Sequence, residues 1–291
     1  MRNKVVGVIL IGMLVLSACS SLDANEYDTE VVLDNEVSSV SVSEESNDES
    51  AAETTHNDSS IESQIQVIVQ NRDVWKITYV DGPVTSPFSC YYITDYDHNG
   101  RLEITASECQ GTGIYTSTSI YEVNSDFNGI ELIDDNGDAP EFEYEKIKMF
   151  YNEADQTYMY IGTNHGKSGA LWGGNIKCAL YLEDGVIHYN KIAAEEYQPN
   201  GEDSDELVFS YTDNTGATIT KEQFETAEDE LYKSYDQQEV SFGVIYNESD
   251  NVFQDLSDDI MAQMLMKSYE TFSGQISYDE FKEIEEKIRT S

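Results

Sequence analysis

The chain has 291 residues and a formal net charge of −41, because 57 Asp and Glu residues face only 16 Lys and Arg residues. This balance argues against a nucleic-acid partner and against anionic membrane surfaces, since phosphate contacts need clustered Lys and Arg. It is compatible with divalent cations, with cationic partners or with simple solubility.

The N-terminus has the order of features of an export signal. A short basic segment, residues 1–4, precedes the apolar residues 5–16. As a helix this apolar run rises roughly 18 Å, which is short of the ~30 Å hydrocarbon core of a bilayer and predicts a signal segment instead of a membrane span. Leu16-Ser17-Ala18-Cys19 resembles the bacterial lipobox. The resemblance implies that residues 1–18 are removed and that Cys19 carries a diacylglyceryl group; the alternative is an ordinary secretory signal with an incidental cysteine.

Residues 19–59 are predicted to be a disordered, acidic, Ser-rich tether that begins at the lipidated cysteine. They are rich in Ser, Glu, Asp, Asn and Thr, and Tyr27 is their one aromatic residue. Such a composition buries too little apolar surface to offset chain entropy. Two acyl chains give stable anchoring, so we expect the chain at the extracytoplasmic face of the cell membrane, with residues 60–291 forming the folded domain.

The segment Asp95-Tyr-Asp97-His-Asn99-Gly100-Arg101-Leu-Glu103 has the spacing of a calcium loop. Oxygen-bearing side chains stand at positions 1, 3, 5 and 9, and a glycine at position 6 permits a sharp bend. The main-chain carbonyl of Arg101 supplies a further oxygen. The sequence therefore predicts a calcium site formed by Asp95, Asp97, Asn99, Arg101 and Glu103.

The flanks of this loop are β-rich, so it joins two strands and is not an EF-hand, which also needs a glutamate where this sequence has Ala106. The loop resembles the short strand-loop-strand calcium motif of integrin-type propeller repeats. The alternative is a plain hairpin turn at Asn99-Gly100. A plain turn does not account for three crowded carboxylates, which repel one another unless a cation or solvent relieves them.

The folded part is predicted to be an α+β domain, with an antiparallel β-meander sheet on which an N-terminal helix and C-terminal helices pack. A capping-box pattern at Ser59–Glu62 opens a helix, another at Thr220–Gln223 opens a second, and two helices finish the chain. Short β-rich runs separated by Asn, Asp and Gly predict the strands, at residues 90–94, 102–105, 114–123, 130–133, 142–151, 158–162, 178–182, 186–189, 207–211 and 240–246.

Three further motifs are weaker. Asp134, Asn136 and Asp138 repeat the acidic spacing without the glycine, which leaves a second cation site open. Residues 162–169 contain Gly-Lys-Ser but are one residue too short for a phosphate loop, so a strand connection or a ligand surface is expected. Residues 273–281 resemble the back half of an EF-hand without its acidic ligands, and we interpret them as a helix end followed by a helix cap.

The cysteines that remain after Cys19 leave two arrangements open. Cys90 and Cys109 lie at the far ends of the predicted hairpin and face each other in one arrangement; in the other, these two and Cys178 are buried thiols. The sequence has no Cys-x-x-Cys pair, which argues against a cysteine zinc site. The histidines stand apart from one another, so no catalytic residue is assigned.

This combination of lipobox, low-complexity tether and α+β domain with an Asp-x-Asp-x-Asn-Gly loop resembles the acidic surface lipoproteins of gut-dwelling clostridia. The expected function is that of a lipid-anchored, calcium-stabilised binding or adhesion module that meets an extracellular ligand or protein. The alternatives are a ligand-delivery lipoprotein for a transporter and an exported hydrolase; an enzymatic role is left open and is not favoured.

Overall fold

The computed structural model describes residues 59–77, 88–110, 115–134, 140–167, 171–201, 204, 206–247 and 253–290. The predicted signal segment, Cys19 and residues 20–58 of the tether lie outside the described residues, as do residues 135–139 of the second acidic loop. The chain divides into two compact units, residues 1–53 and 54–291, and all described elements belong to the second. No helix in the described ranges is long and apolar enough to cross a membrane.

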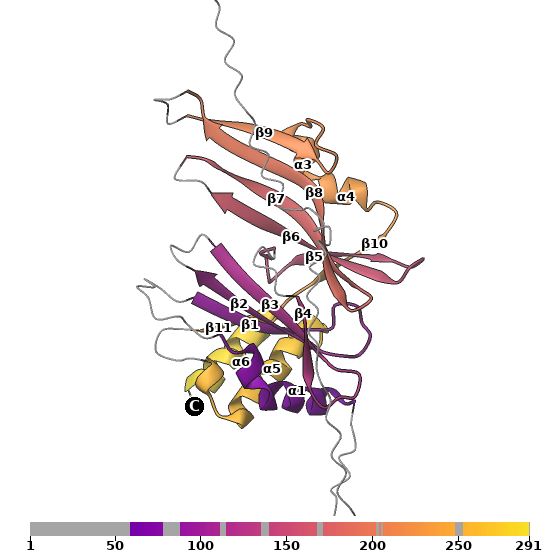
Figure 1. The fold of residues 1–291 in the computed structure, drawn as a ribbon, viewed down its shortest axis with the longest axis vertical. Helices are drawn as coiled ribbons and strands as arrows, with labels where there is room; N and C mark the ends of the chain where they lie inside the picture. Colours follow the sequence, from indigo (N-terminus) through magenta and orange to yellow (C-terminus); the bar gives the residue numbers. More distant parts are fainter. Residues whose placement is uncertain are drawn as a thin grey trace, which may run out of the picture. The chain divides into compact units, whose positions relative to one another are not determined.

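The strands of the described residues form two antiparallel sheets (Figure 1). The five-stranded sheet has the order β11-β1-β2-β3-β4, with β1 Phe88–Thr94, β2 Glu103–Gln110, β3 Tyr115–Val123, β4 Ile130–Asp134 and β11 Ile245–Asn247. The six-stranded sheet has the order β10-β5-β6-β7-β8-β9, with β5 Ile147–Asn152, β6 Thr157–Lys167, β7 Gly173–Glu183, β8 Val186–Pro199, β9 Leu207–Asp213 and β10 Asp236–Val240.

Helices from both ends of the folded part cover one face of the five-stranded sheet (Figure 1). They are α1 Ile61–Gln70, α2 Arg72–Trp75, α5 Asp258–Phe272 and α6 Tyr278–Thr290, and the short 3-10 helix η1 Phe253–Asp255 precedes α5. Two short helices, α3 Lys221–Glu225 and α4 Ala227–Leu231, contact β8 and β9 of the six-stranded sheet. The predicted α+β class is confirmed, with strands predominating.

The alternation of side chains along β1 builds the core. Tyr91 is buried among the helices, where its ring lies 5.4 Å from that of Trp75. Its neighbour Tyr92 points to the opposite face and joins Tyr160 of the six-stranded sheet in a second buried cluster. Successive strand residues face opposite sides, so β1 contributes side chains to the core beneath the helices and also to the core that includes the six-stranded sheet.

Three predicted elements differ from the structure. Residues 142–146 of the strand expected at 142–151 lie outside any strand, and β5 begins at Ile147. Residues 240–246 were expected to form one strand, but β10 ends at Val240 in the six-stranded sheet and β11 begins at Ile245 in the other. The helix expected after Thr220 is divided into α3 and α4 at Thr226. The capping box of Thr220 and Gln223 is confirmed, whereas α1 is capped by Ser60 and not by Ser59.

The strand register also bears on the cysteines. Cys90 lies opposite Ser107, and Cys109 lies opposite Phe88, so the two cysteines are not directly cross-strand neighbours. Cys90 and Cys178 are buried thiols. For these two residues the structure agrees with the second arrangement, in which the cysteines contribute to the core; the side chain of Cys109 lies outside the described residues.

Candidate metal centre

The predicted calcium loop connects β1 to β2, whose terminal residues Thr94 and Glu103 are paired. Its shape follows from short polar side chains that accept backbone hydrogen bonds. Asp97 accepts from the Asn99 N–H at 3.1 Å, and Asn99 accepts from the Arg101 N–H at 2.7 Å. Such turns are typical of Asp and Asn. Gly100 has a φ of 83°, a conformation that favours glycine.

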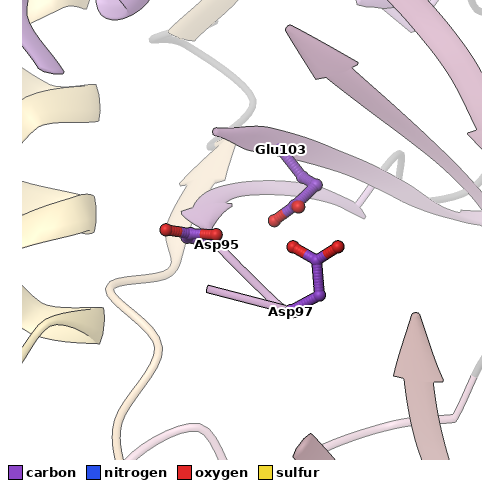
Figure 2. Close-up of side chains that lie close together, drawn as sticks. All are labelled: Asp95, Asp97 and Glu103. Atoms are coloured by element: carbon purple, nitrogen blue, oxygen red, sulfur yellow. The ribbon is translucent and has the colours of Figure 1, made fainter. Parts of the chain in front are cut away.

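Three of the predicted ligands converge (Figure 2). Asp95, Asp97 and Glu103 each offer a carboxylate oxygen, and these oxygens lie within 4.8 Å of one another. Asp95 is 7% exposed and Glu103 is 0% exposed, while Asp97 is half-buried. Carboxylate oxygens at such separations can serve as a ligand set for a hard cation.

Glu103 has an oxygen that the surrounding protein does not satisfy. Its Oε2 accepts a hydrogen bond from the Tyr96 N–H at 2.9 Å. Its Oε1 is buried and has no hydrogen-bond partner among the described residues. In Figure 2 the Glu103 carboxylate faces that of Asp97. A buried, unsatisfied carboxylate oxygen costs free energy, and a cation bound between these carboxylates would remove that cost.

The electrostatics of the group point the same way. Burial, together with the charge of Asp97, raises the pKa of Asp95 from 3.8 to about 7. Burial, together with the charges of Asp95 and Asp97, raises the pKa of Glu103 well above its usual value. Without a cation these two groups therefore retain protons at a pH where ordinary carboxylates are ionised.

The other two predicted ligands make further contacts in the loop. The side-chain oxygen of Asn99 accepts from the Arg101 N–H at 2.7 Å, and its Nδ2 donates to Asp97 at 3.0 Å and to Glu122 at 2.9 Å. Asn99 thus shapes the loop in this structure. The Arg101 guanidinium pairs with Glu122 at 2.7 Å. Its main-chain carbonyl, the ligand atom that the sequence suggests, stays a prediction.

Glu122 supports the loop through Asn99 and Arg101, a role that sequence reasoning missed. It lies on β3 directly opposite Glu103, and it is 3% exposed. Burial raises the pKa of Glu122. The hydrogen bond from Asn99 and the charge of Arg101 partly offset this rise. Nothing in the sequence near position 122 indicates this role, because only the pairing of β2 with β3 brings the residue to the loop.

The six-stranded sheet supports the loop from its other side. Tyr160 donates from its hydroxyl to the Tyr96 carbonyl at 3.1 Å. The ring of His98 lies 4.0 Å from the ring of Tyr158. Partial burial lowers the pKa of His98 below its usual value, although the charge of Asp97 opposes the shift, so this side chain adds no positive charge to the site at neutral pH.

The remaining motifs have structural roles. Residues 157–167 form the continuous strand β6, so the described part of the Gly-Lys-Ser segment is not a phosphate loop. Gly274 follows α5 with a φ of 72°, and Ser277 accepts from the Glu280 N–H at 3.2 Å at the start of α6. This is the helix end and helix cap that the sequence predicts.

No protein-family model matches the chain, and neither a curated protein nor a solved structure matches it. The functional proposal therefore depends on the chemistry of the loop and on the sequence features of the N-terminus.

Proposed function

We propose that this chain is a lipid-anchored extracytoplasmic protein whose folded domain is a calcium-stabilised binding or adhesion module. The observation that carries the proposal is the convergence of Asp95, Asp97 and Glu103 around a buried carboxylate oxygen that has no partner among the described residues. The lipobox-like residues ending in Cys19 and the acidic tether supply the anchor and the spacer.

Calcium fits this site better than other common cations. The three converging side chains offer oxygen only, which suits hard cations and disfavours zinc and copper, whose preferred ligands are His and Cys. Magnesium usually keeps several waters and needs near-ideal octahedral geometry, whereas calcium accepts an irregular set of protein oxygens. A tight loop with two nearly inaccessible carboxylates favours the cation that sheds its water more readily.

The same burial argues against catalysis at this site. A substrate would have to reach Asp95, which is 7% exposed, or Glu103, which is 0% exposed. An ion fits between these groups, but a glycan or a peptide does not. The ligand-delivery alternative is also disfavoured, because such proteins usually alternate strands and helices. Strand pairs in the described residues are antiparallel throughout.

Thermal unfolding of the full-length protein in calcium, in magnesium and in a chelator tests the cation. Extracellular modules bind calcium with dissociation constants of about 10⁻⁴ to 10⁻³ M, so 10 mM calcium stabilises by about 1.4 to 2.7 kcal/mol. That is a rise in Tm of roughly 3 to 10 °C. Magnesium should have a much smaller effect. Equal midpoints in calcium and chelator would contradict the proposal.

Labelling with a radioactive fatty acid of cells that express the parent or Cys19→Ser tests the anchor. We expect label on the parent and none on the variant, because the variant lacks the thiol that is acylated. An unlabelled parent, or equal labelling of both proteins, would contradict lipidation at Cys19.

A further inference from the structure

Gln64 of α1 is a buried polar side chain that reaches into the candidate metal loop. It is 0% exposed. Its Nε2 donates to the Gly100 carbonyl at 2.8 Å, and its Oε1 accepts from the Leu102 N–H at 2.8 Å. The two partners fix the orientation of the amide, because a carbonyl needs a donor and an N–H needs an acceptor.

These two contacts fall between the first and the last acidic residue of the loop. Gly100 also donates its N–H to the Asp95 carboxylate at 3.2 Å, and Leu102 immediately precedes Glu103. The backbone that Gln64 holds therefore sets how far the Asp95 and Glu103 oxygens lie from each other. A displacement of this backbone would open the ligand set.

The same amide group reaches the start of the folded domain. Nε2 also donates to the Ser59 carbonyl at 3.0 Å, and Ser60 is the N-cap of α1. The loop and the first turn of α1 are thus tied to one side chain, at the point where the predicted tether ends. The loop carries the three carboxylates, and Gln64 connects the backbone of the loop to α1.

We infer that Gln64 is a positioning residue for the cation, and that occupancy of the loop and order in the first turn of α1 are coupled through it. The inference rests on the proposed calcium site and adds a regulatory consequence: calcium tightens the junction between tether and domain. Coupling between two sites is reciprocal. A loosened first turn therefore weakens calcium binding by the same factor by which calcium tightens that turn.

Hydrogen–deuterium exchange of the full-length protein, with and without 10 mM calcium, tests the coupling together with a calorimetric titration. In the parent we expect calcium to slow exchange of the amides of residues 60–70 about tenfold. Exchange in α4, on the other sheet, should change less.

Gln64→Met removes all three hydrogen bonds of the Gln64 side chain and keeps the helix propensity. It should bind calcium about tenfold more weakly, with slowing confined to residues 95–103. The exposed Gln66→Met is the matched control and should behave as the parent does.

The possible results separate the two proposals. Calcium binding that slows exchange at residues 95–103 of the parent, but not at residues 60–70, would overturn the coupling and leave the calcium site intact. This comparison needs no variant, so it holds even if Gln64→Met folds poorly. Parent-like calcium affinity in Gln64→Met would also overturn the positioning role. Absence of calcium binding in the parent would remove the proposed function itself, and the coupling with it.

Discussion

Replacing Asp95 with asparagine should stabilise the calcium-free protein and abolish its response to calcium. The folded environment raises the pKa of Asp95 from 3.8 to about 7. One pKa unit corresponds to about 1.4 kcal/mol, so at pH 8 the ionised carboxylate costs the folded state up to about 4 kcal/mol. The asparagine side chain has nearly the same shape, carries no charge and can still accept the Gly100 N–H.

Urea unfolding at pH 8 measures both effects. In a chelator the variant should exceed the parent in free energy of unfolding. In 10 mM calcium the parent should gain about 1.4 to 2.7 kcal/mol and the variant nothing. Asp126→Asn, at an exposed position in the next hairpin turn, is the control and should behave as the parent does. A variant that is less stable than the parent in chelator, or that gains as much from calcium, would refute the electrostatic reasoning.

Two further predictions concern the charges around the loop. Without calcium the free energy of unfolding should fall as the pH rises from about 4 to 7, because the raised pKa of Asp95 makes the folded state bind a proton that the unfolded state releases. Urea unfolding at several pH values measures this free energy. A rise over the same pH range would contradict the prediction. Calcium should reduce the fall, since it favours the ionised carboxylates. Arg101→Gln leaves buried Glu122 without its ion pair, so this variant should lower the free energy of unfolding by about 3 kcal/mol. Lys233→Gln removes an exposed ion pair with Glu230 and should lower it by less than about 1 kcal/mol. Chemical denaturation of both variants measures these losses, and equal losses of stability would contradict the burial argument.

The local features of the loop were predictable from the sequence. Asn99-Gly100 between two β-rich runs indicates a hairpin, and the structure pairs β1 with β2 on either side of it. The alternating Asp95 and Asp97 with Glu103 indicate a converging acidic group, which is present. These features depend on residues within one turn, where sequence spacing largely determines geometry.

The features that were missed depend on which strands pair. Val240 and Ile245 lie in different sheets. Gly243 between them is a local sign of an interrupted strand, but it does not indicate which sheet each half joins. Glu122 and Gln64 reach the loop from β3 and α1, through a strand register and a helix position that no local pattern encodes. The role of the Asn99 side-chain oxygen as a ligand stays a prediction; in this structure that oxygen accepts from the Arg101 N–H, two residues along the loop.

Calorimetric titration of the full-length protein with calcium, beside Asp97→Asn and the control Asp126→Asn, tests the central claim most directly. The account predicts saturable binding in the parent and the control, with a dissociation constant of about 10⁻⁴ to 10⁻³ M, and loss of that binding in Asp97→Asn. No binding by the parent up to 10 mM calcium, or equal binding by all three proteins, would show that residues 95–103 form an acidic hairpin turn and not a cation site.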